Sequence, residues 1–249
     1  MRCRLLPHEA GDGPTHMATD DWMLSLVSAD PTRAMLRTYE WSIPTLSLGY
    51  FQSRAEAEAD PRWRGVPLVR RATGGGAIWH DRELTYAVVV PERHPLARRA
   101  KDLYRAVHAA IAALLRERDI PARRRGEAEA RSGPDRPLLC FTDRDAEDLV
   151  VFGSKILGSA QRRRAGALLQ HGSLLLATSE RTPELPGLAA LAPELGSARP
   201  ACWASPVGDR IASALGLEAI EQETTPEERD EVGRIAEAIY RAPSWTDRR

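Results

Sequence analysis

Apolar residues that recur every three or four positions predict the helices of this chain. The clearest helix is expected between Pro95 and Asp119, where apolar residues share one face and arginines occupy the other. Thr15 is expected to cap the start of another helix, which stops before Pro31. The helices predicted in this way span 15–28, 95–119, 207–215 and 226–241.

Short apolar runs bounded by glycine, proline or charged residues predict the strands. They are expected at 2–6, 34–39, 45–50, 66–71, 84–90, 149–152, 155–162 and 167–176. The charged segment 122–137 is expected to be a surface loop or a poorly ordered excursion, and 183–206 is a proline-rich passage. The chain shows no internal repeat and no second core behind a linker. These patterns predict a single α+β domain over residues 1–249.

The composition argues against several classes of protein. The 35 basic and 35 acidic side chains cancel, which argues against a general nucleic-acid or membrane-surface binder. Three cysteines are too few for a disulfide framework or a structural zinc site, so we expect no metal. No apolar run approaches the roughly 20 residues of a membrane span, and the first residues do not resemble a signal peptide. We therefore expect a soluble, cytoplasmic protein.

A glycine-rich block lies between two predicted strands. Arg71-Ala72-Thr73 leads into Gly74, Gly75 and Gly76, and His80 follows shortly afterwards. Glycine allows the backbone to approach a ligand closely. The Lys-Ser/Thr ending of a phosphate-binding loop is missing, and no dinucleotide fingerprint follows. The block is either a turn that contacts a ligand or simply a flexible turn.

Lysine is rare in this chain, because only Lys101 and Lys155 are lysines and the other basic residues are arginine. Lys155 lies between Gly153 and Gly158 in an otherwise apolar strand. A compact ammonium group in such a place can stabilise an anion, an oxyanion or a thiolate. The alternative is a lysine that protects the edge of a sheet from aggregation. Lys101 is expected to be solvated on the polar face of the long helix.

The three cysteines differ in their surroundings along the chain. Cys140 lies at the exit of the charged loop and is expected to enter a strand. A nearby cation such as Lys155, or a histidine, would favour its thiolate and make it a nucleophile, whereas without one it would be an inert small hydrophobe. Cys202 is the competing nucleophile, and Cys3 is expected to be incidental.

The histidines and the arginine clusters are ambiguous from sequence alone. His171 is either a site residue or a hydrogen-bonded core residue, and His80 is similarly open. His94 and His108 are expected to lie on helix surfaces. The arginine clusters at 123–125 and 162–164 are either solvated or positioned to bind an acidic partner.

Several segments, taken in order, resemble the superfamily of lipoate–protein ligases, octanoyltransferases and biotin–protein ligases. The resemblance runs from residue 5 to residue 176. Cys140-Phe141 and Glu83-Leu84-Thr85-Tyr86 look most like the Gram-positive-type, cysteine-dependent octanoyltransferases. The segments that carry the resemblance are Met17–Asp20, Trp41–Gln52, Arg70–Gly76, His80–Tyr86, the Lys155 strand and Leu169–Ser173.

The resemblance implies a fold and a set of site residues. The fold would be α+β, with a mixed β-sheet wrapped around a narrow acyl tunnel and flanking helices, those at 207–241 included. Cys140 would be the catalytic nucleophile, and Lys155 would be the catalytic amine. The residues implied for substrate binding are Arg71, Thr73, Gly74, Gly75, Gly76, His80, Gly158, Gln161, His171 and Gly172.

The chain also departs from the family pattern. Gly76 stands where the matching transferases commonly have arginine, which favours the ligases. Trp203 replaces the glycine that usually follows the cysteine of the other octanoyltransferase branch, which disfavours Cys202. The residues after Leu176 are too few for the full accessory domain that many ligases carry, so we expect none.

The activity implied by the resemblance is transfer of an octanoyl group from acyl carrier protein to a lysine of a lipoyl-domain protein, without a cofactor. The acceptor would be a glycine-cleavage carrier protein or a 2-oxoacid dehydrogenase subunit. One alternative is an ATP- and Mg²⁺-dependent lipoate–protein ligase, and another is a non-catalytic module that binds acyl-carrier or lipoyl domains. The donor, whether acyl carrier protein or another lipoyl domain, stays open. We expect a monomer.

Overall fold

A mixed β-sheet forms the centre of the molecule. The computed structural model describes residues 1–131, 137–195 and 198–248. Within these residues the main sheet has eight strands, with parallel pairing among the first three and antiparallel pairing among the rest. In spatial order they are β11 (Glu218–Glu221), β1 (Arg2–Gly11), β2 (Ala34–Trp41), β6 (Glu83–Pro91), β10 (Ala167–Leu175), β9 (Ser154–Arg164), β8 (Leu149–Val151) and β7 (Arg123–Arg124).

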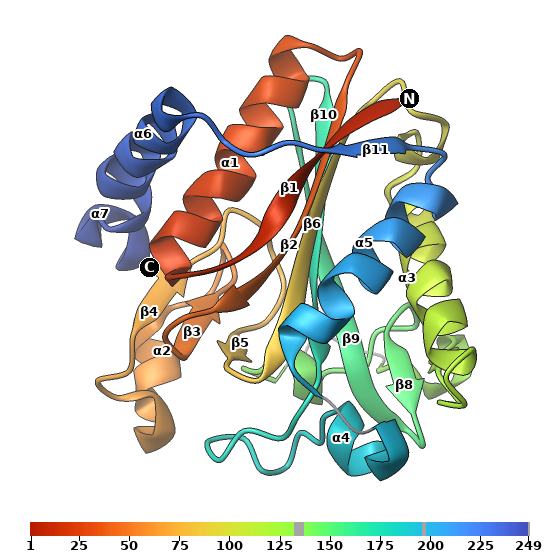
Figure 1. The fold of residues 1–249 in the computed structure, drawn as a ribbon. Coiled ribbons are helices and arrows are strands. Elements are labelled where there is room, and N and C mark those ends of the chain that lie inside the picture. The colour runs from red at the N-terminus through yellow and green to blue at the C-terminus, as the bar shows by residue number, and fades with distance from the viewer. Residues whose placement is uncertain (132–136, 196–197, 249) are drawn as a thin grey trace.

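A smaller sheet carries the glycine block. Its strands are β4 (Leu68–Arg70), β3 (Thr45–Leu48) and β5 (Ile78–His80), in that order. Residues 71–77, which include the three consecutive glycines, connect β4 to β5. Figure 1 shows this sheet beside one end of the main sheet, below helix α1 (Gly13–Ala29).

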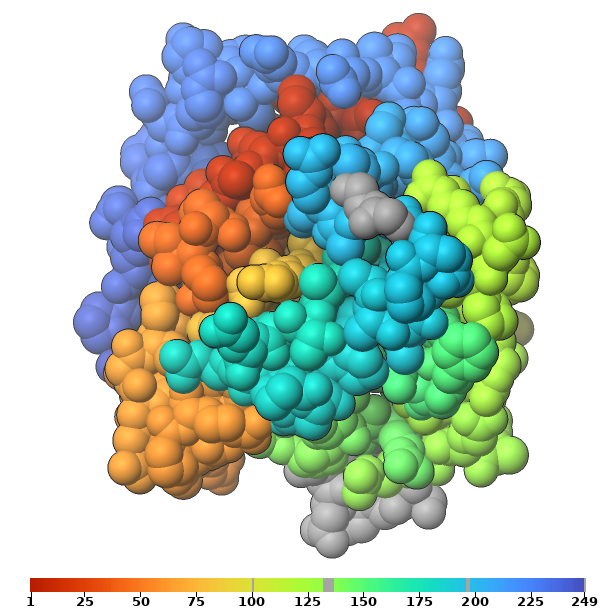
Figure 2. Space-filling view, turned by 60° about the horizontal axis from the view of Figure 1, so that its bottom comes forward, coloured from red at the N-terminus to blue at the C-terminus, as the bar shows by residue number. Residues whose placement is uncertain are grey.

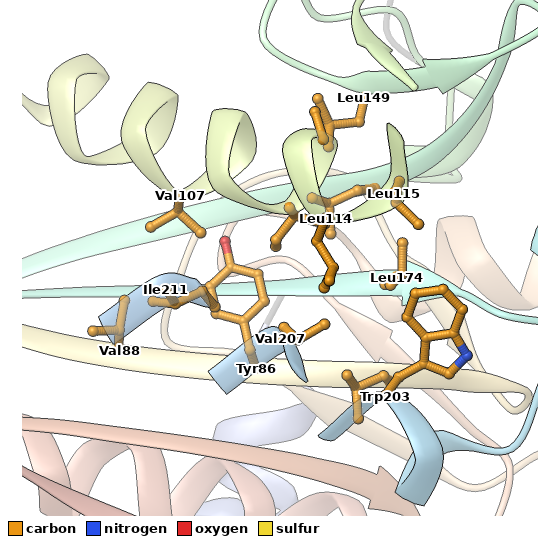
Figure 3. Close-up of a cluster of buried hydrophobic side chains, with 14 of the residues drawn as sticks. Tyr86, Val88, Val107, Leu114, Leu115, Leu149, Leu174, Trp203, Val207 and Ile211 are labelled. Carbon is orange, nitrogen blue, oxygen red and sulfur yellow. The ribbon is translucent and has the colours of Figure 1, made fainter. Parts of the chain in front are cut away.

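Helices cover both faces of the main sheet (Figure 1). On one face, Tyr86 and Val88 of β6 pack against the two helices α3 (Ala100–Arg116) and α5 (Pro200–Ala214) (Figure 3). On the other face, Ala87 and Val89 of the same strand pack against α1. Because β6 is buried on both faces, its apolar residues run without interruption. The shorter helices are α2 (Arg54–Ala59), α4 (Leu188–Leu191), α6 (Pro226–Ile235) and α7 (Pro243–Thr246).

This architecture confirms the predicted α+β fold with a mixed sheet and flanking helices. The apolar face of the predicted long helix is buried as expected, since Leu103, Val107 and Ile111 all have no exposed surface. The segment after β10 crosses one end of the molecule from the small sheet to the α3 side (Figure 2). No helix in the described ranges has the length and apolar character needed to cross a membrane.

Two predicted helix starts are wrong by several residues. Helix α1 begins at Gly13, and its N-cap is Asp12, whose carboxylate accepts the Thr15 backbone N–H at 3.0 Å. The proline-rich passage contains the first turns of α5, which begins at Pro200. Proline suits the first turn of a helix, because its missing N–H has no partner there in any case.

Three strands escaped sequence prediction because they lack alternation. β5 and β7 are only three and two residues long, and every residue of β11 is exposed. β7 also shows that the predicted surface loop at 122–137 is partly wrong, because Arg123 and Arg124 pair with β8. Residues 132–136 of that segment lie outside the described residues.

His94 and His108 are buried, so their prediction as helix-surface residues is wrong. His94 Nε2 lies 3.0 Å from the Leu215 carbonyl oxygen. His108 bonds the Glu147 carbonyl and the Ser159 hydroxyl, each at 2.7 Å, and burial lowers the pKa of His108 to about 3. Helical spacing identifies the apolar face of α3, but it does not show that other segments also pack on its polar side.

Candidate active site

Cys140 and Lys155 come together in space. Cys140 begins a single 3-10 turn at Cys140–Thr142, which corrects the expectation that it enters a strand. Lys155 is the second residue of β9. Its Nζ lies 3.6 Å from Cys140 Sγ and donates a hydrogen bond to the Cys140 carbonyl at 2.8 Å. The ammonium therefore lies within hydrogen-bonding reach of both the sulfur and the carbonyl oxygen of Cys140.

Lys155 is buried and paired with a carboxylate. Its side chain is 3% exposed, so it does not act as a solvated lysine that protects a sheet edge. Nζ lies 2.8 Å from Asp148 Oδ1. Burial alone would lower the pKa of Lys155, but the charges of Cys140 and Asp148 outweigh burial and raise that pKa above its ordinary value. The lysine is thus held as a cation beside the sulfur.

Two hollows meet at Cys140. A small inner cavity lies between the main sheet and the glycine block. An outer groove of about 820 Å³ leads to solvent. Gly75, Cys140 and Ser159 line both of them. Cys140 therefore lies at the neck where a mainly apolar cavity adjoins a groove that is open to solvent.

Two glycines allow this close arrangement. A Cβ atom on Gly76 would lie 2.9 Å from the Cys140 backbone nitrogen and 3.0 Å from the Leu138 oxygen. A Cβ atom on Gly158 would lie 2.7 Å from Lys155 Cε. In addition, Cys140 N–H donates to the Ala77 carbonyl at 2.7 Å. The glycine block and the Cys140 turn are thus packed backbone against backbone, with no room for a side chain at Gly76.

Replacing Gly76 with alanine is expected to displace the Cys140 turn. The overlap with backbone atoms should cost about 1–3 kcal/mol of unfolding free energy and slow alkylation of Cys140 by iodoacetamide. Urea denaturation and alkylation rates measure the two effects. Gly233→Ala in α6 is the matched control, because nothing lies within 4 Å of a Cβ there and alanine favours a helix. Wild-type stability and reactivity in Gly76→Ala would contradict this assignment.

Arg71 and His80 form a buried polar chain beside the inner cavity. Arg71 Nη1 donates to the Ser47 carbonyl at 2.8 Å, and Nη2 donates to the Gly76 carbonyl at 2.8 Å. Burial lowers the pKa of Arg71 to about 10. His80 Nε2 lies 2.6 Å from Ser47 Oγ, and its Nδ1 lies 2.5 Å from Glu83 Oε1. These hydrogen-bonded side chains hold the glycine block at a defined distance from β6.

His171 links the glycine block to α1. Its Nε2 lies 2.8 Å from Thr73 Oγ1, and its Nδ1 lies 2.8 Å from Asp20 Oδ2. The other Asp20 oxygen accepts a hydrogen bond from Arg37 at 2.6 Å. Burial would raise the pKa of Asp20, but Arg37 and His171 outweigh it and hold that pKa below its usual value. Neither Asp20 nor Arg37 was predicted, although a carboxylate among the apolar residues of helix 15–28 was a visible signal.

The other predicted residues are distributed between the two hollows. Gly74, Gly158 and Gly172 line the inner cavity together with Arg71, His80 and His171. Gln161 lies in the outer groove and donates to Gln170 Oε1 at 2.7 Å. Lys101 lines the outer groove too, so both lysines of the chain border it. Asp148 was not predicted as a site residue. The feature that could have identified it is the position of its carboxylate directly before the apolar strand β8.

The two other cysteines lie away from this site. Cys202 is exposed on α5, and it lines neither the inner cavity nor the outer groove. Cys3 is buried in β1, and burial raises the pKa of its thiol to about 12. Among the residues that the structure describes, no group of three or more histidine, cysteine or carboxylate side chains is placed to hold a metal ion.

Solved structures of lipoate–protein ligases share the fold of this chain. A lipoate–protein ligase A bound with ATP superposes with a TM-score of 0.72 at 23% identity and covers 99% of both chains. A bi-partite lipoate protein ligase from Thermoplasma acidophilum superposes with a TM-score of 0.67 at 22% identity, over 99% of this chain and 96% of that one. Identities this low establish the fold alone.

Sequence comparison identifies the family. An octanoyltransferase LipM from Moorella thermoacetica is 41% identical to this chain, over 70% of this chain and 64% of the relative's own length. This chain spans 60 to 65% of the length of each of the first three curated relatives that it matches. Another, from Symbiobacterium thermophilum, is 35% identical over 99% of this chain and 98% of its own length. Residues 12–187 match the family model described as the lipoyl protein ligase A/B catalytic domain. The chain therefore belongs to the lipoyl protein ligase A/B catalytic domain family.

Proposed function

We propose that this protein transfers an octanoyl group from the thioester of an acyl carrier protein to a lysine of a lipoyl-domain protein. The observation that carries the proposal is the position of Cys140 Sγ, 3.6 Å from the Lys155 ammonium and at the neck between the two hollows. The relatives named octanoyltransferase LipM support the same reaction. In this proposal the acyl chain occupies the inner cavity, and both protein substrates approach through the outer groove.

The first half-reaction forms an acyl-enzyme. The Cys140 thiolate attacks the thioester carbonyl, the bond from that carbon to the donor sulfur breaks, and the donor leaves as a thiol after taking up a proton. Lys155 is the group available to stabilise the tetrahedral oxyanion, because the Cys140 backbone N–H is already bonded to Ala77. The negative charge moves from the Cys140 sulfur to the carbonyl oxygen as the sulfur attacks. The Lys155 ammonium hydrogen that faces the sulfur can then donate a hydrogen bond to that oxygen.

The second half-reaction releases the product. The neutral amine of the acceptor lysine attacks the Cys140 thioester, the bond from carbon to sulfur breaks, and the amine loses one proton as the amide forms. The sulfur leaves as the thiolate beside Lys155, so the resting state is restored. Conversion of a thioester to an amide is downhill, and we therefore expect no requirement for ATP, Mg²⁺ or another cofactor.

The acceptor proposed is a glycine-cleavage carrier protein or a 2-oxoacid dehydrogenase subunit. We also propose that the protein acts in the cytoplasm as a monomer. Acyl carrier protein is the proposed donor, and an octanoylated lipoyl domain is the other donor to be compared with it. Supplying each donor in turn with each acceptor distinguishes these pairings.

The test is octanoyl transfer without nucleotide. Purified protein is incubated with octanoyl-acyl carrier protein and a lipoyl domain, and the acceptor lysine is analysed by mass spectrometry. Octanoylation without ATP supports the proposal. Incorporation of free lipoate that depends on ATP selects the ligase instead, an alternative that Gly76 favours. Complex formation with either domain but no turnover selects a binding module, and both outcomes overturn the proposed transferase.

A further inference from the structure

Lys155 places an amine beside the atom that is proposed to carry the acyl group. Its Nζ lies 3.6 Å from Cys140 Sγ. In the acyl-enzyme the thioester carbon is bonded to that sulfur, so the carbon lies one bond away from an atom that Lys155 contacts. Attack of a neutral amine on this carbon is also how the proposed reaction forms its product. The protein therefore holds, next to its own thioester, a group of the kind that the acceptor supplies as nucleophile.

The protonation state of Lys155 decides whether it can react in this way. An ammonium group donates three hydrogen bonds and has no lone pair with which to attack a carbonyl. The groups within reach of its hydrogens are the Cys140 carbonyl at 2.8 Å, Cys140 Sγ at 3.6 Å and Asp148 Oδ1 at 2.8 Å. Because the side chain is 3% exposed, water contributes little to keeping it charged. The charge of Lys155 therefore depends on its anionic neighbours.

Acylation of Cys140 removes one of these anionic neighbours. Burial lowers the pKa of Lys155, and the charges of Cys140 and Asp148 raise it. A thioester sulfur is uncharged, so of these two charges the acyl-enzyme retains that of Asp148. Burial raises the pKa of Asp148 in turn, and Lys155 opposes that rise. Asp148 Oδ2 accepts the Asp145 backbone N–H at 2.8 Å, which fixes the carboxylate beside the ammonium.

Among the described carboxylates, Asp148 supplies this counter-charge alone. Within residues 1–131, 137–195 and 198–248 it is the one carboxylate with an oxygen within 4 Å of Lys155 Nζ. Asp145 is exposed to solvent, and Glu147 binds Arg105 at 2.7 Å. The charge that opposes the burial of Lys155 is therefore concentrated in one side chain.

Three other titratable groups near the pair add no negative charge. Burial lowers the pKa of His108 to about 3, so its ring is neutral. Burial also raises the pKa of Tyr104 well above its ordinary value, so its phenol is neutral. Arg125, whose Nε lies 3.9 Å from Asp148 Oδ2, is a cation. Loss of the Asp148 charge would thus leave a buried ammonium among neutral and positive groups, which favours the neutral amine.

We propose that Asp148 keeps Lys155 protonated in the acyl-enzyme and thereby prevents the protein from transferring the octanoyl group to its own lysine. The inference rests on the proposed function, because the acyl group must first be bound to Cys140. Asp148 acts through Lys155 and is therefore a positioning residue.

The reaction that Asp148 prevents is an acyl shift from sulfur to nitrogen. A neutral Lys155 Nζ would attack the thioester carbon, the bond from that carbon to Cys140 Sγ would break, and the sulfur would leave as a thiolate. The nitrogen would lose one proton to solvent as the amide forms. An amide on Lys155 removes the oxyanion donor and does not pass the acyl group on, so the protein would be inactivated.

Asp148→Asn tests the proposal, because it removes the charge and keeps the size of the side chain. Each protein is incubated with octanoyl-acyl carrier protein without an acceptor and is then treated with hydroxylamine, which cleaves a thioester but not an amide. Mass spectrometry of the peptides measures the octanoyl group on Lys155. It should form about tenfold faster or more in the variant than in the wild type at neutral pH.

Two further variants serve as controls for this test. Asp148→Glu keeps the charge and should hold self-acylation near the wild-type level. Asp143→Asn removes another carboxylate of the outer groove and should also behave as the wild type. Asp148→Ser, which is smaller and also uncharged, replaces Asp148→Asn if that variant does not fold.

A second measurement needs no acyl transfer. In Cys140→Ala the charge of the sulfur is absent, as it is in the acyl-enzyme, and acetic anhydride labels neutral amines. Lys101, the only other lysine of the chain, is exposed and serves as the internal reference. Lys155 should be labelled more slowly than Lys101 in Cys140→Ala. Adding Asp148→Asn should raise the rate for Lys155, relative to Lys101, by about tenfold or more.

Two results overturn the proposal. One is a wild-type protein that moves its octanoyl group to Lys155 at neutral pH, a result that needs no variant. The other is equal labelling of Lys155 whether residue 148 is charged or not. A wild type that never gains an octanoyl group on Cys140 contradicts the proposed function instead, because the labelling result does not depend on transfer.

Discussion

Cys140→Ala is expected to abolish octanoyl transfer, with a loss of roughly 10³- to 10⁶-fold. We expect this loss because no other described cysteine lines the inner cavity or the outer groove, so none can replace Cys140 as the nucleophile. Wild-type protein incubated with octanoyl-acyl carrier protein should gain an octanoyl group on Cys140, and hydroxylamine should remove it. Mass spectrometry of the intact chain and of its peptides measures both steps.

The matched control for this variant is Cys202→Ala. Cys202 is exposed on α5, so its replacement should leave transfer and the acyl-enzyme unchanged. Two results would contradict the role of Cys140. One is full transfer by Cys140→Ala, and the other is an acyl group that is found on Cys202 instead.

Lys155→Met is expected to lower kcat of transfer by roughly 10²- to 10³-fold, the effect of losing one oxyanion donor. Iodoacetamide should also alkylate Cys140 more slowly at neutral pH, since the cation beside its sulfur is lost. Lys155→Arg should recover part of the alkylation rate but little of the transfer rate. Its planar guanidinium keeps the charge without the compact donor.

Loss of folding must be separated from loss of catalysis in this series. Lys155→Met leaves Asp148 buried without its counter-charge, and burial raises the pKa of Asp148, so its protonation would relieve part of the cost. Combining Lys155→Met with Asp148→Asn removes both charges and should restore the unfolding free energy, but not transfer. Transfer at the wild-type rate by this double variant would show that Lys155 has no catalytic part.

The local structure of much of this chain could be read from its sequence. The spacing of Leu103, Val107 and Ile111 predicted α3, and the apolar run at 84–90 predicted β6. Lys155 stood out because lysine is otherwise almost absent, and the residues themselves suggested it as a cation beside Cys140. The resemblance to a family implied the catalytic roles of the two residues. Each of these features lies within one helix or strand, or rests on a residue type that is rare in the chain. Both kinds of feature are visible in a single sequence.

Contacts between distant elements were not visible in the sequence. Asp20 from α1 reaches His171 on β10, and His108 on the polar side of α3 is covered by β9 and the residues before it. Neither contact leaves a periodic pattern, because a polar residue looks the same along the chain whether water or another element faces it. Burial of such a residue is decided by what packs on it.

The sequence by itself determined most of the longer helices and strands, the α+β class and the candidate pair Cys140 and Lys155. The tertiary structure alone decided that these two side chains meet where the inner cavity adjoins the outer groove. The physical reason is that hydrophobic periodicity reports which side of a helix or strand avoids water. A site arises where several elements converge, and its distances depend on strand register and on packing between layers.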